Sequence, residues 1–424
     1  MNPELRFKDQ DGNDFPDWEE KKIKEISIFR RGSFPQPYGL PEWYDEHNGK
    51  PFIQVADVTN NMKVNEDTNQ HISKLAESKS VFVPKGSVII TIQGTIGRVA
   101  ITPYDAYVDR TLLIIQSNKN EINKEYQIFA LYNIFNKEKA KADGGILKTI
   151  TKETLKNFII PIPISDEQKK IARLLYDIDK KIESQVTLVE KLKNTKDAMF
   201  VKMFPQGDNV NPTLRFKKED GSNYADWRKE KLNKIASPKA RIGWQGMRQS
   251  EFLDFGDYYL ITGTDFDNGS INFDTCCYIE KYRYDQDKNI QVHNGDILIT
   301  KDGTLGKVAY ISNMDKPATL NAGVFVLNNL DEEMDSLFLY HYLAAPFLME
   351  YANQQATGGT IKHLNQKVLV SFEVPIPEKE EQIKIGKCLS DLDKEIEINQ
   401  QKYEKLRDVK KALLSKLFPT KEDE

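Results

Sequence analysis

The chain is a twofold repeat, and this feature limits its possible folds more than any other. The motif Leu-Arg-Phe-Lys at residues 5–8 returns at residues 214–217, and Asp-Trp at 17–18 returns at 226–227, in both cases 209 positions later. Residues 86–100 and 295–309 match at the same spacing and share the pattern Gly-Thr-Ile/Leu-Gly-Arg/Lys-Val-Ala. A chain of 424 residues that repeats itself in register is expected to fold as two related units.

Each copy is expected to end in a long helix that begins after a Pro-Ile-Pro motif. This motif lies at residues 161–163 and 375–377, and Glu-Gln follows it at 167–168 and 381–382, now 214 positions apart. Acidic residues in the first turn stabilise the N-terminus of a helix. Both helices run toward a Phe-Pro pair, at residues 204–205 and 418–419, where proline stops a helix.

The apolar residues of both helices recur in alternating steps of four and three, which is the heptad pattern of a coiled coil. The polar residues Lys196 and Lys410 interrupt the two seams at equivalent positions, and a helix from residue 171 to 203 rises about 48 Å. Two unrelated surface helices, each packed on its own domain, are the alternative, but the shared seam favours two helices that pack on each other. The seam positions are Ile171, Leu175, Ile178, Ile182, Gln185, Val189, Leu192, Ile385, Leu389, Leu392, Ile396, Asn399, Tyr403 and Leu406.

The segments before the helices have a different pattern. They contain short apolar runs, such as residues 87–92 and 296–300, separated by Gly, Asn, Asp and Pro, which is typical of mixed, strand-rich domains. We therefore predict an α+β fold with two globular mixed α/β domains, separated by two long helices that pack as an antiparallel coiled coil with cyclic twofold pseudo-symmetry. The expected boundaries are residues 1–165 (first domain), 166–205 (first helix), 206–379 (second domain), 380–419 (second helix) and 420–424 (tail).

Composition restricts the class of protein. No apolar run approaches the roughly 18 residues of a membrane span, and the N-terminus lacks the order of charged and apolar residues found in a signal peptide. Three cysteines cannot build a disulfide framework or an ordinary zinc site. We expect a soluble protein of the reducing cytoplasm.

The sequence carries no recognisable catalytic or metal-binding motif. Residues 303–307 resemble a phosphate-binding loop, but the spacing is wrong, and Val308 stands where a magnesium-binding hydroxyl belongs. A turn between two strands, with glycines that tolerate positive φ, is the simpler interpretation. The five histidines form no H-E-x-x-H or H-x-x-x-H arrangement. We therefore predict neither a catalytic residue nor a metal site.

The polar loops, which differ between the copies, hold the candidate nucleic-acid contacts. Residues 30–44 correspond to 239–248, and residues 53–57 correspond to 261–265. Their Arg, Lys, Gln and Thr side chains can hold phosphates or hydrogen-bond base edges. Variable surface loops, a turn-anchoring aspartate and a helix cap are the alternatives. The candidates are Arg30, Arg31, Gln54, Gln93, Thr95, Arg98, Lys148, Lys239, Arg241, Arg248, Thr262, Lys301, Thr304, Lys307, Lys362 and His363.

The whole pattern resembles the specificity subunit of type I restriction-modification systems. The resemblance rests on the twofold cyclic order of domain and helix, on G-T-[IL]-G-[RK]-V-A, and on G-G-x-[IL]-K followed by P-I-P and E-Q. It implies that each globular domain is a target-recognition domain that reads one half of a bipartite, asymmetric site in double-stranded DNA. It also implies that the paired helices set the spacer between the half-sites, in a system that defends against foreign DNA.

The resemblance also implies partners and cofactors. Two modification (methyltransferase) subunits are expected to dock on this scaffold and to carry the S-adenosylmethionine chemistry at adenine N6. Restriction subunits are expected to add translocation and cleavage with ATP and Mg. We expect no cofactor in this chain, which lacks the glycine-rich loop and the N-P-P-[FY] motif of such a methylase.

Two other classes of function are alternatives: an enzyme with a duplicated active site, and a coiled-coil adaptor that binds no DNA. A duplicated enzyme should repeat its polar residues, whereas the identities fall mainly on glycines, prolines and apolar positions. An adaptor has no need of two large divergent domains.

The net charge of −4 bears on how DNA is held. Residues 166–205 hold nine basic and seven acidic side chains, residues 380–419 hold nine and eight, and the rest of the chain is therefore at −7. Local basic loops are then expected to supply register and readout, while partner subunits supply the bulk electrostatic attraction.

Overall fold

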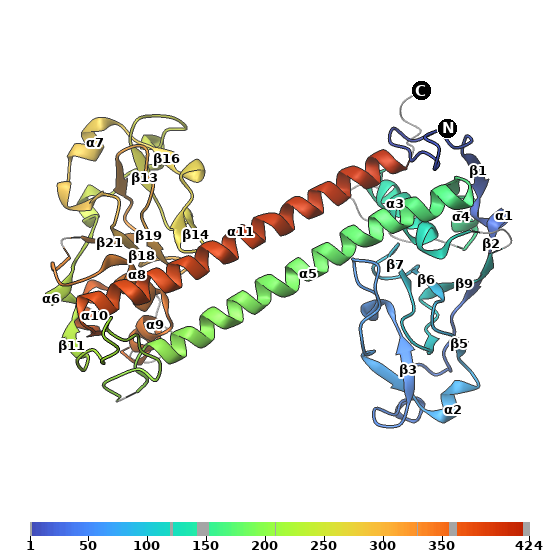
Figure 1. Cartoon of the computed structure of the whole chain (residues 1–424), viewed down its shortest axis with the longest axis horizontal. Helices are drawn as coiled ribbons and strands as arrows, with labels where there is room; N and C mark the ends of the chain where they lie inside the picture. Colours follow the sequence, from blue (N-terminus) through green and yellow to red (C-terminus); the bar gives the residue numbers. More distant parts are fainter. Residues whose placement is uncertain are drawn as a thin grey trace. The chain divides into compact units, whose positions relative to one another are not determined.

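In the computed structural model, which describes residues 2–118, 122–141, 152–207, 209–328, 330–355 and 363–418, the chain divides into two compact units. Unit 1 comprises Met1–Val186 and Lys402–Glu424, and unit 2 comprises Thr187–Gln401. Both long helices, α5 (Ser165–Met203) and α11 (Lys379–Leu417), contribute to both units (Figure 1). The contacts between residues thus divide each helix between the two units, whereas the boundaries predicted from the sequence give each helix as a segment of its own.

Two four-stranded sheets build the globular part of unit 1. One has the order β2 (Ser27–Arg31), β9 (Leu112–Asn118), β6 (Val88–Thr91), β7 (Val99–Ile101) and is antiparallel throughout. The other has the order β4 (Gln70–Ile72), β3 (Lys50–Ile53), β8 (Ala106–Val108), β5 (Val81–Val83), with β3 and β8 parallel. The first sheet is buried on both faces. In β6, Val88 and Ile90 face the core that includes α3 (Lys124–Lys141), and Ile89 faces the second sheet.

Unit 2 repeats this architecture. Its antiparallel sheet has the order β12 (Ser237–Ala240), β21 (Val324–Asn328), β18 (Ile297–Thr300), β19 (Val308–Tyr310), and its mixed sheet has the order β16 (Cys277–Tyr278), β13 (Tyr259–Ile261), β20 (Ala318–Leu320), β17 (Gln291–Val292). A hairpin of β14 (Phe266–Asp267) and β15 (Ser270–Ile271) is added. The shorter helices of both units are α1 (Ile23–Ile26), α2 (Lys74–Glu77), α4 (Lys152–Lys156), α6 (Leu232–Ile235), α7 (Lys281–Asp285), α8 (Ser336–Ala344), α9 (Phe347–Gln354) and α10 (Gln366–Ser371). The predicted α+β class is confirmed.

A repeated polar cluster joins each globular part to the start of its long helix. In unit 1, Arg6 forms two hydrogen bonds with the buried Glu167, Nε to Oε1 at 3.1 Å and Nη2 to Oε2 at 2.8 Å, and Trp18 Nε1 donates to the same carboxylate at 2.9 Å. These hydrogen bonds to Glu167 raise the pKa of Arg6. In unit 2, Arg215 and Trp227 bind Glu381 in the same way.

We call this connection between the globular part and the start of the long helix the joint. The other repeated motifs also lie there. The Pro-Ile-Pro segments pair as strands with the residues that follow the Asp-Trp motif: β1 (Glu19–Lys22) with β10 (Ile159–Ile162), and β11 (Arg228–Lys231) with β22 (Glu373–Ile376). Gln168 accepts a hydrogen bond from the backbone N–H of Asn123 at 2.9 Å, and Gln382 accepts one from Asp335 at 2.8 Å. The glutamate of each Glu-Gln pair thus holds the N-terminal segment, and the glutamine holds the start of α3 or α8.

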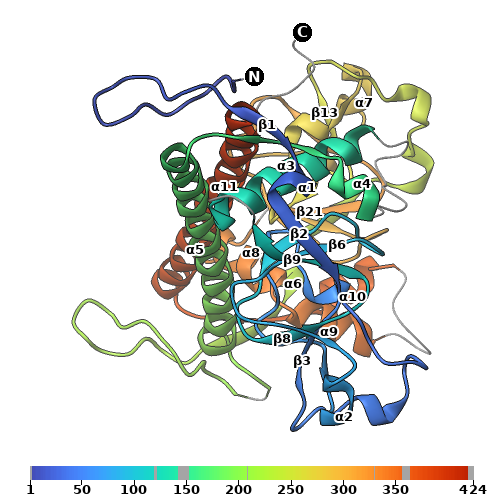
Figure 2. The same ribbon diagram turned by 90° about the vertical axis from the view of Figure 1, so that its right-hand side faces the viewer.

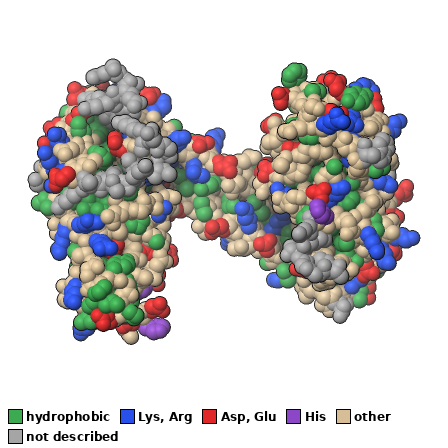
Figure 3. Space-filling model, turned by 180° about the vertical axis from the view of Figure 1, so that it is seen from behind, with side chains coloured by type: hydrophobic (Ala, Val, Ile, Leu, Met, Phe, Trp, Pro, Cys, Tyr) green, Lys and Arg blue, Asp and Glu red, His purple; other side chains and the backbone are tan. Residues whose placement is uncertain are grey.

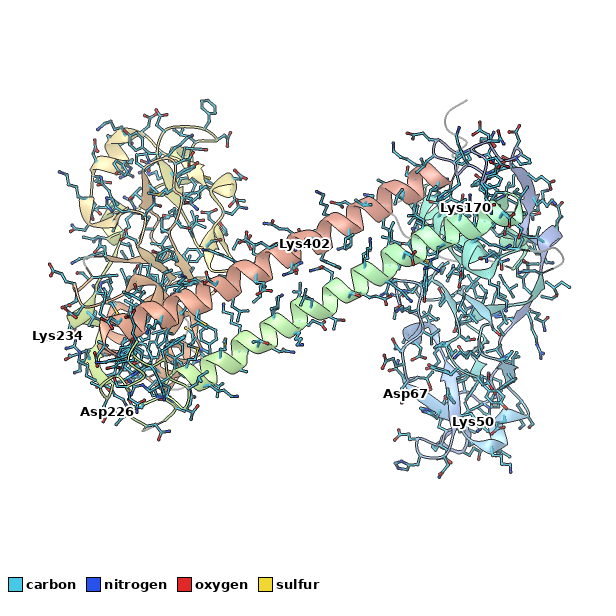
Figure 4. All side chains as sticks on the ribbon, viewed as in Figure 1. Lys50, Asp67, Lys170, Asp226, Lys234 and Lys402 are labelled. Carbon is cyan, nitrogen blue, oxygen red and sulfur yellow. The ribbon has the colours of Figure 1, made fainter. Side chains whose placement is uncertain are left out.

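A loop leaves the joint in each unit. Residues 8–14 form a narrow turn closed by a bridge between Lys8 and Asp14 (Figure 2). Lys170 of α5, labelled in Figure 4, donates a hydrogen bond to the carbonyl oxygen of Lys8. Lys384 of α11 does the same for Lys217 at 2.8 Å.

Within each unit the segments of α5 and α11 run antiparallel. In unit 1 the ion pair Asp179–Lys410 joins them, with 2.5 Å between Oδ1 and Nζ, and in unit 2 the ion pair is Lys196–Asp393. The lysines that interrupt the apolar seams therefore pair with aspartates of the other helix. None of the predicted seam residues is exposed. The chain start and the helix ends are also linked cyclically, because Leu5 N donates to Lys416 O and Leu214 N donates to Lys202 O.

The long helices end two residues before the expected limits. Phe204 and Phe418 lie beyond the last helical residues Met203 and Leu417. A residue that precedes proline is disfavoured in the helical region, which accounts for the difference. Among the described residues, no helix has the length and hydropathy that crossing a membrane requires.

Replacing Glu167 by alanine should destabilise unit 1 by about 3 kcal/mol, because it leaves the half-buried Arg6 guanidinium and the Trp18 N–H without their acceptor. Urea denaturation followed by tryptophan fluorescence measures the loss. Asp166→Ala is the matched control one residue away, since its ion pair with Lys169 is exposed, and it should leave the transition nearly unchanged. Equal losses in the two variants would refute the role of the buried cluster.

Candidate nucleic-acid interface

The repeated glycine motif forms the same loop in both units. It joins β6 to β7 in unit 1 and β18 to β19 in unit 2. Thr91 Oγ1 donates to the Thr95 carbonyl at 2.6 Å and accepts from the backbone N–H of Arg98 at 2.9 Å. Thr300, Thr304 and Lys307 repeat both bonds. The predicted turn between strands is confirmed.

The backbone of this loop requires glycine at two positions in each unit. Gly94 and Gly97 have φ of 68° and 77°, and Gly303 and Gly306 have φ of 72° and 71°. A Cβ atom on Gly97 would also lie 2.8 Å from the Phe135 ring, so this glycine lets the loop approach α3. The tip is nevertheless open, since Gln93, Thr95 and Thr304 are exposed.

A second loop, after β3 in unit 1 and β13 in unit 2, lies beside the glycine loop. Its buried aspartate accepts a backbone hydrogen bond from three residues earlier: Asp57 Oδ2 from Gln54 N at 2.8 Å, and Asp265 Oδ2 from Thr262 N at 2.7 Å. The shared aspartate therefore anchors a turn, which was the structural alternative. A Cβ atom on Gly94 would lie 3.5 Å from Val55 of this loop.

Backbone hydrogen bonds bring further segments to the same place. In unit 1, Ile92 N donates to Thr111 O and Asp109 N donates to Ile53 O; in unit 2, Lys301 N donates to Gly323 O and Asn321 N donates to Ile261 O. We define the loop edge of unit 1 as residues 31, 53–58, 91–98 and 109–111, and that of unit 2 as residues 241, 261–265, 300–307, 320–323 and 363.

Most of the predicted contacts lie on these two loop edges. Exposed there are Arg31, Gln93, Thr95, Thr304, Lys307 and His363. Half-buried there are Gln54, Arg98, Thr262 and Lys301. Arg30 and Lys239 lie on the adjacent strands β2 and β12, and Arg248 is an exposed residue of the segment that follows β12. Lys148 and Lys362 lie outside the described residues.

The two basic residues of the glycine motif differ in their surroundings. Arg98 is half-buried, and its Nη1 donates to the carbonyl oxygen of Val58 at 2.6 Å, which ties the glycine loop to the neighbouring loop. Lys307 is exposed. Lys307 is thus the more accessible of the two for a phosphate.

Arg241 does not fit the prediction of a phosphate contact. Its side chain is 2% exposed, and its Nε donates to the carbonyl oxygen of Leu320 at 2.8 Å. Burial, reinforced by the nearby Arg283, lowers its pKa. In this position the guanidinium holds the segment after β12 against β20 and cannot reach a phosphate.

Three residues on or beside the loop edges, Tyr38, Arg110 and Asp302, were not predicted from the sequence. Tyr38 Oη accepts a hydrogen bond from Gln54 Nε2 at 2.7 Å, and the Arg110 guanidinium lies 5.4 Å from the Tyr38 ring centre. Burial, together with the negative charge of Asp109, raises the pKa of Tyr38 to about 12. In unit 2, His363 Nδ1 lies 2.7 Å from Asp302 Oδ1. The divergence of the two copies at these positions was the available signal.

Charge on the described surface is mixed. On the face in Figure 3, Lys and Arg side chains alternate with Asp and Glu over both units. Among the described residues, no group of three or more His, Cys, Asp and Glu side chains is arranged to hold a metal ion. The face in Figure 3 therefore shows no broad patch of a single charge among the described residues.

Comparison with known proteins identifies the family. The profile described as type I restriction modification DNA specificity domain matches residues 16–194 and again residues 226–408. The chain belongs to this family. Its two matches correspond to the two halves of the repeat, and they confirm the resemblance drawn from the sequence.

Relatives support the same assignment. This specificity protein is 23% identical over 440 residues to the type I restriction enzyme MjaVIII specificity subunit of Methanocaldococcus jannaschii, covering 99% of this chain and 96% of that protein. It is 23% identical to the EcoBI specificity subunit of Escherichia coli, covering 83% of this chain and 74% of that protein. The fold is similar to the S subunit of M. genitalium, with a TM-score of 0.64, 18% identity and coverage of 99% and 100%.

Arg98→Ala should lower the stability of unit 1 by about 1 kcal/mol, because it removes the hydrogen bond to Val58 and leaves that carbonyl oxygen without its donor. Lys307→Ala is the matched control at the equivalent position, and it should leave the stability of unit 2 unchanged within error. Thermal unfolding by circular dichroism measures both. A stable Arg98→Ala variant would show that the bond contributes nothing.

Proposed function

We propose that each globular domain reads one half of a bipartite, asymmetric DNA site through its loop edge, and that α5 and α11 fix the spacing of the half-sites. The observation that carries the proposal is a pair of loop edges whose backbones are held by equivalent hydrogen bonds and whose exposed side chains differ. A shared backbone gives both halves the same approach to DNA, and divergent side chains give each half a different sequence preference.

Local charge supports a division of labour with partner subunits. The segments outside the two helices carry a net charge of −7, so the chain by itself lacks the positive surface that non-specific DNA binding needs. Exposed basic residues such as Arg31 and Lys307 supply register at the loop edges. We expect the isolated chain to bind DNA weakly and the assembled complex to bind tightly.

Catalysis in this proposal belongs to other chains. Two modification subunits, with S-adenosylmethionine, methylate adenine N6, and restriction subunits with ATP and Mg translocate and cleave DNA. The loops that leave the two joints, residues 8–14 and 217–223, are closed by equivalent bridges, which suits a partner that binds twice. A similar fold occurs in a solved structure that addresses the structural basis of complex assembly and conformational transition of the type I R-M system. The TM-score is 0.55, the identity is 15%, and the match covers 95% of this chain and 98% of that chain.

The two helices suit the task of a ruler. Each has 39 residues and is therefore about 58 Å long, whereas half-sites read on one face of B-DNA lie about 34 Å apart. Half-buried ion pairs such as Asp179–Lys410 hold the helices together in a single register within each unit. A stiff pair of this kind keeps a fixed distance between the two readers.

The chain produced with its modification subunits should methylate a single split motif, two short specified sequences separated by a fixed number of unspecified base pairs. Mapping methylated adenines across a genome by long-read sequencing tests this. A control strain that lacks this chain should show no such methylation. A continuous motif, or methylation without any motif, would overturn the proposal.

Lengthening the ruler should lengthen the spacer. One heptad inserted into α5 after Val186 and one into α11 after Lys402 adds about 10 Å, which corresponds to about 3 base pairs. These points face each other if the register of Asp179 with Lys410 continues along the helices. The half-sites should stay the same while the spacer grows in the methylation map. An unchanged spacer would count against the ruler, and insertion into one helix alone is the control that should abolish methylation.

A further inference from the structure

The glycine loops of the two units are closely similar, yet they differ in side-chain chemistry at two adjacent positions. Residues 91–98 read Thr-Ile-Gln-Gly-Thr-Ile-Gly-Arg, and residues 300–307 read Thr-Lys-Asp-Gly-Thr-Leu-Gly-Lys. Gln93 and Asp302 occupy the same place, directly before the first glycine of the motif. The two units therefore present a carboxamide and a carboxylate from the same backbone.

The backbone holds this position in the same way in both units. The preceding residue donates its N–H to the loop edge, Ile92 to Thr111 O and Lys301 to Gly323 O, each at 2.9 Å. The following glycine has a positive φ in both units, 68° at Gly94 and 72° at Gly303. The side chain between these two fixed points consequently leaves the backbone at the same point of each loop.

Both side chains are accessible to a ligand. Gln93 is exposed, and it forms no hydrogen bond with the described residues. The Asp302 side chain is 44% exposed, and its Oδ1 lies 2.7 Å from His363 Nδ1. Among the described residues its Oδ2 has no hydrogen-bond partner. The histidine thus orients the carboxylate and leaves one oxygen available.

The neighbouring loop positions are suited to the DNA backbone. The shared threonine, Thr95 or Thr304, and the basic residue, Arg98 or Lys307, are alike in the two units. A group that is the same in both halves cannot distinguish two different half-sites, whereas hydroxyl and cationic groups can contact phosphates irrespective of sequence. Two positions of the loop change in side-chain chemistry. Ile92 is buried, and Nζ of the half-buried Lys301 lies 5.5 Å from the Phe325 ring centre. Within this loop, discrimination between half-sites therefore falls to Gln93 and Asp302.

We propose that Gln93 and Asp302 are equivalent base-reading residues, Gln93 recognising an adenine and Asp302 the amino group of a cytosine; this rests on the proposed function. A carboxamide donates and accepts at once, which matches adenine N6 and N7 in the major groove. A carboxylate only accepts, which matches the cytosine N4 amino group. The half-site read by unit 1 therefore contains an adenine at the Gln93 contact, and that of unit 2 contains a C·G pair at the Asp302 contact.

The test is the methylation map of the complex with its modification subunits, comparing the natural chain with Gln93→Ala and Asp302→Ala. In the Gln93→Ala complex, one specified adenine of one half-site should become degenerate, with a loss of discrimination of roughly 10- to 100-fold. In the Asp302→Ala complex, one specified C·G pair of the other half-site should become degenerate. Each variant is the control for the other, because the second half-site and the spacer should not change.

Asp302→Asn supplies a second readout that does not depend on loss of a group. The amide keeps an acceptor for His363 and adds a donor, so the preference at that position should move from cytosine toward adenine. The assignment of the base-reading residues would be overturned if the half-sites stayed unchanged in all three variants. It would also be overturned if methylation fell at all sites without a change in base preference at any single position. A natural complex without any split motif would instead overturn the proposed function itself.

Discussion

The architecture depends on a buried arginine–glutamate pair that occurs twice. The pairs are Arg6–Glu167 and Arg215–Glu381. In both copies a tryptophan N–H donates a further hydrogen bond to the carboxylate. A buried carboxylate is stable only when its oxygens are hydrogen-bonded, so the three residues require one another. Each pair therefore attaches the first residues of its copy to the first turn of the long helix.

The structure separates two kinds of repeated residue. The motifs Leu-Arg-Phe-Lys, Asp-Trp, Pro-Ile-Pro and Glu-Gln build the joint, whereas the glycine motif builds the loop edge. Both are repeated because each serves the same mechanical purpose in the two units. Within the loop edge, positions such as Gln93 and Asp302 can diverge, because the hydrogen bonds that hold the surrounding backbone do not involve their side chains.

Much of the fold could be predicted from the sequence, because local patterns report burial directly. The heptad steps predicted α5 and α11 with errors of one or two residues at their ends, and the apolar runs at residues 87–92 and 296–300 marked β6 and β18. The candidate site was less accessible to prediction. Arg241 was expected to contact DNA, and it is 2% exposed, with its guanidinium bound to the Leu320 carbonyl. Its partner lies 79 positions away, and no local pattern reveals such a contact.

The sequence by itself determined the twofold repeat, the two long helices, the α+β class and the family. These features follow from spacing and periodicity, which are properties of neighbouring residues. Only the tertiary structure decided which polar residues lie together on a loop edge and which of them form hydrogen bonds that hold its backbone in place. The reason is that the loop edge forms where strands distant in sequence pair, as β3 does with β8, and the position of a loop side chain follows from that pairing.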